Sequence, residues 1–255
     1  MNLGIKKFTT LRCALRKSAV IGFSTMVVLT FAISAQAGSN LVLNGGFEST
    51  SNGNGEMGYN TNATDWTTSG YNFIYAPGTA DTTGANGQYG NISLWGPGNG
   101  SSNGMPASSP NGGNIVAADG AFQVGAITQL ITGLTPGASY SVSFWWAGAQ
   151  QYGFTGATTE QWQVSFGSQE QSTIVLNNAS HGFTGWQYQT FTFTASGTSD
   201  LLSFLAVGTP SGVPPFSLLD GVSLTQLPEP ATWTMLISGL MGVAGAARLR
   251  KRAKS

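Results

Sequence analysis

The sequence predicts an all-β protein, with an antiparallel β-sandwich of about 190 residues between two apolar terminal segments. Between Gly38 and Gln226 the apolar runs are short, and Gly, Pro and Asn turn signals separate them. No stretch of this body shows helical periodicity. All ten Lys and Arg residues lie outside it, five before Ser18 and five after Ala247. These observations favour one β domain with its own core.

Residues 1–37 read as a signal peptide. An apolar run from Ala19 to Ile33 leads into Ala35-Gln36-Ala37, which has the small residues of a cleavage site. The alternative is an uncleaved N-terminal anchor. Five basic residues precede the apolar run: Lys6, Lys7, Arg12, Arg16 and Lys17.

The first half of the body, residues 38–113, is rich in turn-forming residues. Asn40–Phe47 is expected to form the first strand and to end in an Asn-Gly turn. Residues 49–113 are expected to form long loops between short strands, with apolar islands at Tyr71–Tyr75 and Ile92–Trp95. Disorder is the alternative for this loop-rich segment, but its aromatic residues favour at least partial packing.

The second half of the body carries clearer strand signals. Ala121–Ile131 and Ser139–Ala147 are β-prone runs, and Pro136-Gly137 between them suits a type II turn, so we expect a hairpin. On the second run, alternation places Tyr140, Val142, Phe144 and Trp146 on one face. Further strands are expected at Gln161–Phe166, Thr173–Leu176, Trp186–Thr194, Leu201–Val207 and Phe216–Leu224.

Three segments of the body resemble the galactose-binding-like jelly rolls. They are Asn40–Glu48 (NLVLNGGFE), Leu134–Tyr140 (LTPGASY) and Leu219–Leu224 (LDGVSL). That family includes many carbohydrate-binding modules of extracellular bacterial proteins. The resemblance spans nearly the whole body, and it implies a jelly-roll sandwich more than it implies a function.

The charge of the body limits its partners. Residues 38–226 contain nine acidic residues and no Lys or Arg, which gives a net charge of −9 with His181 neutral. Without cations the body cannot neutralise phosphates, so we expect no nucleic acid binding, whereas neutral glycans stay possible partners. The only cysteine, Cys13, falls in the signal peptide, so the exported body is expected to lack disulfides.

The C-terminal segment, residues 227–255, has three parts in a fixed order. Pro228-Glu229-Pro230 comes first, then the uncharged run 231–247, which is apolar enough for a transmembrane helix. The third part is a basic tail that includes Arg248, Arg250, Lys251 and Arg252.

This arrangement closely resembles the PEP-CTERM sorting signal of Gram-negative, exopolysaccharide-producing bacteria. The resemblance implies export by the general secretion machinery, a transient membrane anchor, and cleavage near Pro228 by an exosortase-type membrane protease. The body would then reach the cell surface or the medium. The alternative is a plain C-terminal anchor helix.

Two acidic residues are candidates for a structural calcium site. Glu48 and Asp220 lie at the ends of the first and last expected strands. In the jelly rolls that this sequence resembles, those strands lie close together, and acidic residues there often bind Ca²⁺. An exported domain without disulfides would be stabilised by such an ion. The alternative is that both are solvated acids.

Aromatic residues supply candidates for sugar stacking. Trp145, Trp186 and Tyr188 point away from the expected core faces of their strands, and their rings could stack on the C–H faces of sugars. Trp66, Tyr71 and Trp95 in the loop-rich segment could contribute. The alternative is that these rings are core residues under covering loops.

Signals for catalysis are weak. His181 has no nucleophile motif around it, so we name no catalytic residue. The threonines at 190, 192 and 194 read as an ordinary exposed strand face, and ice binding is not expected. We therefore predict a surface-sorted, non-catalytic protein of an exopolysaccharide or biofilm matrix that binds neutral glycan. The alternatives are a secreted glycan-active hydrolase and a purely structural matrix protein.

Overall fold

The structure is a computed structural model, and it describes residues 38–228 together with Gly239 and Met241. Every described strand and both buried clusters lie within residues 38–228. A segment with its own core can fold alone, so residues 38–228 are a suitable unit for experiments.

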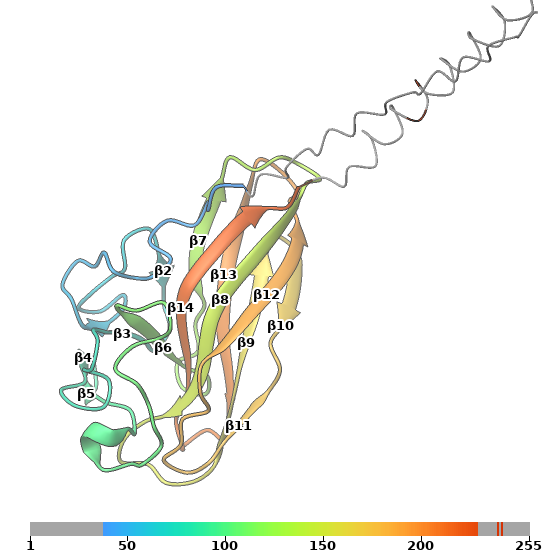
Figure 1. Cartoon of the computed structure of the whole chain (residues 1–255). Coiled ribbons are helices and arrows are strands. Elements are labelled where there is room, and N and C mark those ends of the chain that lie inside the picture. Colours follow the sequence, from blue (N-terminus) through green and yellow to red (C-terminus); the bar gives the residue numbers. More distant parts are fainter. Residues whose placement is uncertain (1–37, 229–238, 240, 242–255) are drawn as a thin grey trace, which may run out of the picture. The chain divides into compact units, whose positions relative to one another are not determined.

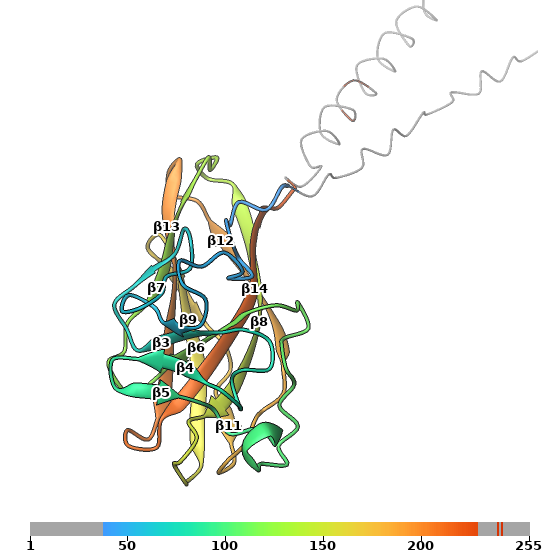
Figure 2. The same ribbon diagram turned by 90° about the vertical axis from the view of Figure 1, so that its left-hand side faces the viewer.

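Two antiparallel sheets form the body, and the first has six strands (Figures 1 and 2). Their order across the sheet is β1, β3, β6, β14, β8, β12. The longest strands, β14 and β8, lie side by side at its centre, with a register shift between Asp220 and Ser223. The strands are β1 (Gly55–Glu56), β3 (Asn72–Tyr75), β6 (Ile115–Asp119), β8 (Ser139–Gln150), β12 (Gln187–Thr194) and β14 (Pro215–Gln226).

The second sheet has the order β10, β9, β13, β7, β2, and β11 also pairs with β9. From β6 onward the chain crosses repeatedly from one sheet to the other, as in jelly-roll sandwiches. Its strands are β2 (Thr67–Thr68), β7 (Ile127–Thr132), β9 (Thr158–Phe166), β10 (Gln169–Ser172), β11 (Leu176–Asn178) and β13 (Ser199–Thr209). The prediction of an all-β antiparallel sandwich is confirmed.

A small hairpin and a short helix lie in the loop-rich segment. The hairpin pairs β4 (Ala85–Gly87) with β5 (Gly90–Ile92), and the 3-10 helix η1 spans Pro97–Asn99. Residues 49–113 therefore contain short strands between loops, as expected, and several of their aromatic side chains are buried.

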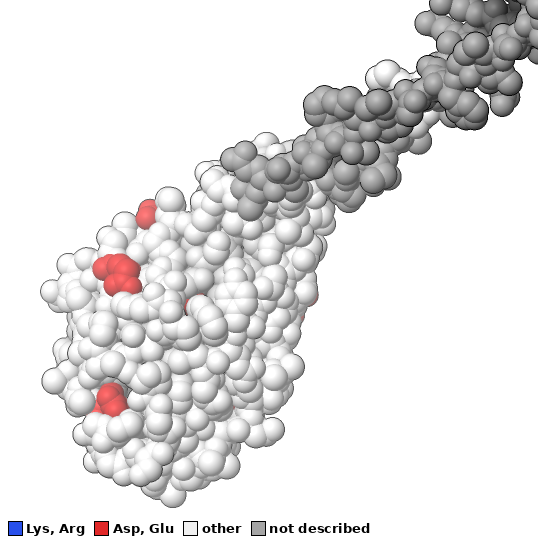
Figure 3. Space-filling model, viewed as in Figure 1, with Lys and Arg blue, Asp and Glu red and all other residues white. Residues whose placement is uncertain are grey.

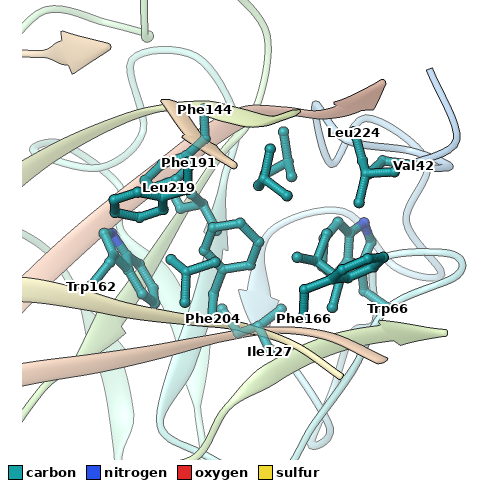
Figure 4. Packing of buried hydrophobic residues seen from close by; sticks show 14 of the residues in the cluster. Val42, Trp66, Ile127, Phe144, Trp162, Phe166, Phe191, Phe204, Leu219 and Leu224 are labelled. Atoms are coloured by element: carbon teal, nitrogen blue, oxygen red, sulfur yellow. The ribbon is translucent and has the colours of Figure 1, made fainter. Parts of the chain in front are cut away.

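The main core fills the space between the two sheets (Figure 4). Alternation along β8 and β9 sends every second side chain inward, including Phe144 and Trp162. The indole N–H of Trp162, on the second sheet, donates to the carbonyl of Leu218 on the first sheet at 3.0 Å. Edge-to-face contacts at Phe204 add to the packing, with ring centroids 5.1 Å from Phe144 and 6.0 Å from Trp162.

A second buried cluster lies on the other side of the first sheet. It combines outward side chains of β3, β6, β8 and β14, such as Phe73 and Phe216, with residues of the loop-rich segment, such as Leu94. The loop-rich segment therefore covers part of the outer face of the first sheet. The outward side chains of β12 and the adjoining part of β8 include exposed and half-buried residues.

Several expected strand boundaries are wrong. Residues 40–47 form no regular strand, although the N–H of Leu41 bonds to the carbonyl of Leu224 and that of Val222 bonds to the carbonyl of Gly45. Residues 121–126 are loop before β7, because the carboxylate of Asp119 caps the N–H groups of Ala121 and Phe122. The strand expected at 173–176 is also displaced, since β10 precedes it and β11 begins at its last residue.

The expected hairpin around Pro136-Gly137 is wrong. Gly137 does have the positive φ of a type II turn, 77°. However, β7 pairs with β13 and β2 in the second sheet, whereas β8 pairs with β14 and β12 in the first. Local turn chemistry fixes the reversal of the chain but not whether its two arms share hydrogen bonds.

The terminal segments fall almost entirely outside the described residues. The signal peptide 1–37, including Ala35 and Ala37, lies outside them, as do Glu229, Pro230 and the basic tail with Arg248, Arg250, Lys251 and Arg252. Of the predicted transmembrane run only Gly239 and Met241 are described, both as helix, and Pro228 is exposed. Within the described part of the chain, no helix has the length and apolar character needed to cross a bilayer.

We expect Gly120→Ala to destabilise the body by about 2 kcal/mol. Gly120 joins the two sheets: its N–H bonds to the carbonyl of Pro215, and its carbonyl accepts the N–H of Gly208. A Cβ at residue 120 would lie 2.5 Å from the backbone nitrogen of Gly208, so the sheets would have to move apart. Urea unfolding measures the change. Gly197→Ala is the matched control, because its Cβ would meet nothing closer than 3.7 Å, and an equal loss there would contradict this reading.

Candidate functional site

The outer face of β14, β8 and β12 carries the most distinctive arrangement of side chains. The three strands lie side by side (Figure 1), and register pairs Trp145 of β8 with Tyr188 of β12 on one side and Asp220 of β14 on the other. Because Phe144 and Trp146 point into the core, alternation turns Trp145 outward. We call this surface the aromatic face.

Two rings form the centre of the aromatic face. The ring centroids of Trp145 and Tyr188 lie 5.1 Å apart with an interplanar angle of 57°, and Tyr188 is 57% exposed. Trp186 precedes Tyr188 by two residues and therefore shares its face. Trp186 is half-buried, however, because it packs beside Phe183 against the second buried cluster. The structure thus places all three predicted aromatic residues on one face, two of them in contact.

Rows of hydroxyl side chains extend the aromatic face along the strands. Register aligns threonines of β12 with serines of β8 and with residues of β14, and the threonines are exposed. Each row runs across strands about 4.8 Å apart, so the hydroxyls form a grid. The rows are Thr190, Ser143 and Ser223; Thr192, Ser141 and Thr225; and Thr194 with Ser139.

Asp220 closes the aromatic face on the β14 side. It is fully buried, with Ser109 Oγ donating to Oδ2 and the N–H of Gly221 donating to Oδ1 at 2.6 Å. Asn111 Nδ2 lies 3.5 Å from Oδ1. Burial, opposed by these hydrogen bonds, raises the pKa of Asp220 to about 7, and the charge of Glu48 also raises it. Residues 38–228 contain no Lys or Arg whose charge would lower this pKa.

Glu48 lies close to Asp220, as the resemblance to jelly rolls implied for the two ends of the body. Oε1 of Glu48 accepts the N–H of Asn114 at 2.9 Å. A Cβ built on Gly46 would lie 3.7 Å from Glu48 Oε1, 3.7 Å from Asp220 Oδ1 and 3.3 Å from Asn111 Nδ2. Glycine at residue 46 thus leaves a small space that two carboxylates and one amide surround.

The two neighbouring carboxylates would suit a hard cation. Carboxylate and amide oxygens are the ligands that Ca²⁺ prefers, and a cation would relieve the repulsion between Glu48 and Asp220. The side chains of Glu48 and Asp220 would hold the ion; the Asn111 atom nearest residue 46 is the donor Nδ2, so that amide would have to turn to offer its oxygen. Within the described residues no group of three or more His, Cys, Asp or Glu side chains surrounds one point, so amide, carbonyl or water oxygens would have to complete the coordination.

The other predicted aromatic residues lie elsewhere. Trp66 is a core residue, 3% exposed, and its indole N–H donates to the carbonyl of Asn44 at 3.0 Å. Tyr71 is buried in the second cluster. Trp95 stacks on His181, with ring centroids 3.9 Å apart. Neither Tyr71 nor Trp95 therefore takes part in the aromatic face. For Trp66 the core alternative was right.

Sequence reasoning missed Ser109 and Asn111. Both lie in a loop more than a hundred residues before Asp220, yet both bond to its carboxylate. The signal that marks them is the turn sequence Asn111-Gly112-Gly113, whose glycines have φ of 82° and 70°. It predicts a tight turn, but nothing in it identifies which strand the turn covers.

Comparisons with known proteins find likenesses of structure only. Neither a family model nor a curated protein matches the chain. A structure of TmCBM61 in complex with β-1,4-galactotriose is 18% identical, with a TM-score of 0.38, over 73% of this chain and 97% of that one. The CBM22-1 xylan-binding domain of Paenibacillus barcinonensis Xyn10C is 12% identical, with a TM-score of 0.37, over 77% of this chain and 100% of that one.

The N-terminal cellulose-binding domain of Cellulomonas fimi β-1,4-glucanase C is 16% identical, with a TM-score of 0.31, over 62% of this chain and 90% of that one. Its likeness is as distant as the others. Likenesses at these TM-scores show no function for this chain.

Proposed function

We propose that the body binds a neutral glycan, without catalysis, on the aromatic face. The observation that carries this proposal is the contact between Trp145 and Tyr188, an outward-facing aromatic pair next to an ordered grid of hydroxyl groups. Aromatic faces complement the C–H faces of sugar rings, and Ser and Thr hydroxyls can both donate to and accept from sugar hydroxyls.

The charge of the body favours an uncharged ligand on this face. Residues 38–228 contain no Lys or Arg, so nothing there would pair with the carboxylates or sulfates of an acidic polysaccharide. The net charge of −9 on the body would repel such groups. A neutral chain of sugars laid along the hydroxyl rows meets neither obstacle.

Calcium belongs to the proposal as a structural ion. Bound by Glu48 and Asp220, it would hold the 109–114 loop against β14, next to Trp145. Its chemical contribution is charge neutralisation at a buried carboxylate. The side chains of the aromatic face would do the binding, and the ion would fix the wall beside them.

The cellular part of the proposal rests on the terminal segments. A signal peptide ending at Ala37 and a PEP-CTERM segment from residue 227 would route the body through the secretion machinery and an exosortase-type protease to the cell surface. Exposed Pro228 lies two residues after the end of β14, so cleavage near it would leave the sandwich whole. A role in an exopolysaccharide or biofilm matrix follows from that destination.

The hydrolase alternative has less support. Glu48 and Asp220 are two neighbouring carboxylates, as glycoside hydrolysis needs. Asp220, however, is fully buried, and hydrogen bonds engage both of its oxygens, so a glycosidic bond could not reach it without rearrangement. A structural matrix protein without a ligand is the remaining alternative, and the binding experiment separates it from the proposal.

A glycan-array screen of residues 38–228, with calcium and with a chelator, tests the proposal. We expect saturable binding to a neutral glycan and at least about tenfold weaker binding by Trp145→Ala, because stacking on one ring contributes about 1.5 kcal/mol. Leu130→Ala, at a 62% exposed position of the opposite sheet, is the control and should bind normally. Absence of binding to any neutral glycan in both conditions would contradict the proposal.

A further inference from the structure

A second surface, at the opposite edge of the first sheet, has a different chemistry. It is a hollow of about 270 Å³ beside β1, and its wall includes Glu56, Tyr59, Thr68, Gln88 and Gln123. Because β1 and β12 are the two edges of a six-stranded sheet, this hollow lies roughly 24 Å across the sheet from Tyr188. We call it the Glu56 hollow.

The hydrogen bonds of Gln88 around Glu56 use the donors of that side chain and leave its acceptor free. Oε2 of Glu56 accepts the backbone N–H of Gln88 at 2.6 Å, and Oε1 accepts Gln88 Nε2 at 2.9 Å. The same Nε2 donates to Oε1 of Gln123 at 2.7 Å. Both amide hydrogens of Gln88 are therefore used, and its remaining capacity is the acceptor Oε1. The second lone pairs of Glu56 add further acceptors.

The carboxylate of Glu56 meets only neutral partners. Its side chain is 3% exposed, and its donors are amides. No Lys or Arg occurs between residues 38 and 228, and Figure 3 shows acidic but no basic atoms on the face that it presents. Burial, followed by the charges of Glu56 and Asp119, raises the pKa of Tyr71 to about 12.

Exposed aromatic rings adjoin the hollow. Gln123 Nε2 donates to the hydroxyl of Tyr89 at 2.7 Å, which links the hollow to the ring of Tyr89. That ring lies 5.6 Å from Phe122 and 5.9 Å from Tyr71, and Tyr89 and Phe122 are 59% and 45% exposed. Exposed aromatic rings attract both sugar rings and cations.

We propose that the Glu56 hollow binds the ammonium group of an amino sugar, while the sugar ring packs on Tyr89 and Phe122. An ammonium has three donors and no acceptor, so it matches the free Oε1 of Gln88 and the negative charge of Glu56. The assignment to a sugar rests on the proposed glycan binding. The ligand class is a glycan with free amino groups, such as a de-N-acetylated hexosamine polymer.

Calorimetric titration of residues 38–228 with a glucosamine tetramer tests this proposal. We expect binding that weakens severalfold between 20 mM and 300 mM NaCl, since salt screens the long-range attraction between a cationic tetramer and a body whose net charge is −9. Glu56→Gln should weaken it about tenfold, because a hydrogen bond to a charged group contributes about 1.5–3 kcal/mol. Glu170→Gln, which removes the same charge from exposed β10, should bind normally.

The N-acetylated tetramer and tetralysine separate the parts of the proposal. Equal affinity for the N-acetylated tetramer would overturn the role of the ammonium, and equal affinity for tetralysine would overturn the sugar. Phe122→Leu tests the ring contact and should weaken binding severalfold even if Glu56→Gln proves unstable; unchanged affinity there would overturn that contact. Trp145→Ala should leave this binding intact, so failure at one site is distinguishable from failure at the other.

Discussion

Calcium is expected to raise the melting temperature of residues 38–228, and to raise it more at pH 8 than at pH 5. Saturation a thousandfold above the dissociation constant stabilises a protein by about 4 kcal/mol, which is roughly 8–16 °C for a domain of this size. The physical reason is the state of Asp220, whose pKa burial raises to about 7. At pH 5 a proton occupies the carboxyl group, and at pH 8 the group is free to bind the ion.

The raised pKa of Asp220 also determines how the stability of the body depends on pH when calcium is absent. The folded Asp220 holds its proton up to about pH 7, whereas the unfolded one loses it near its usual value of 3.8. Between these values the folded state binds more protons, so the free energy of unfolding falls as pH rises from about 4 to 7. Asp119 and Glu160, with pKa values raised by burial to about 6 and about 7, act in the same direction.

Thermal unfolding across pH 4–8, with calcium and with a chelator, measures both effects. Asp220→Asn should lose the calcium response and part of the pH dependence. Glu160→Gln is the matched control: it replaces another fully buried carboxylate, on β9, and should keep the calcium response. If Asp220→Asn kept the rise in melting temperature with calcium, the ion would have to bind elsewhere. If calcium changed the melting temperature at no pH, the proposed calcium site would be wrong.

Trp162→Ala is expected to destabilise the body by about 3–5 kcal/mol, or roughly 6–20 °C in melting temperature. The change leaves a cavity between the sheets and removes the indole N–H from the carbonyl of Leu218. The stability of Trp162→Phe should lie between those of the unchanged protein and Trp162→Ala, because phenylalanine keeps most of the packing but cannot make the hydrogen bond. Urea unfolding gives the values.

The control for Trp162 is an exposed apolar residue. Ile174→Ala removes a side chain that is 62% exposed and should cost less than about 1 kcal/mol. Equal losses at the two positions would mean that the space between the sheets is not the stabilising core, contrary to the packing in Figure 4.

The sequence predicted the sandwich because strand alternation is a local signal. The faces of β8 follow directly from Tyr140, Val142, Phe144 and Trp146, all of which are buried. Sheet membership is not local, and so Pro136-Gly137 suggested a hairpin where the chain crosses between sheets. Short strands such as β1 and β4 were missed because two or three residues show no periodicity.

For the site, too, the features that depend on local alternation could be predicted, and those that depend on distant segments could not. Outward-facing Trp145 and Tyr188 could be named from alternation, and their contact follows from the pairing of β8 with β12. Ser109 and Asn111 could not be placed, because a loop reaches Asp220 only in the folded chain. The Glu56 hollow was likewise beyond reach, since β1, Gln88 and Gln123 come from three separate segments.

The central claim is that a neutral glycan contacts Trp145, and NMR tests it most directly. Indole N–H signals of residues 38–228 can be assigned with single Trp→Phe variants and followed while the best glycan from the array is added. We predict that the Trp145 signal shifts with saturation, while the signals of the core residues Trp66 and Trp162 stay in place. Saturable binding that leaves the Trp145 signal unmoved would contradict the account.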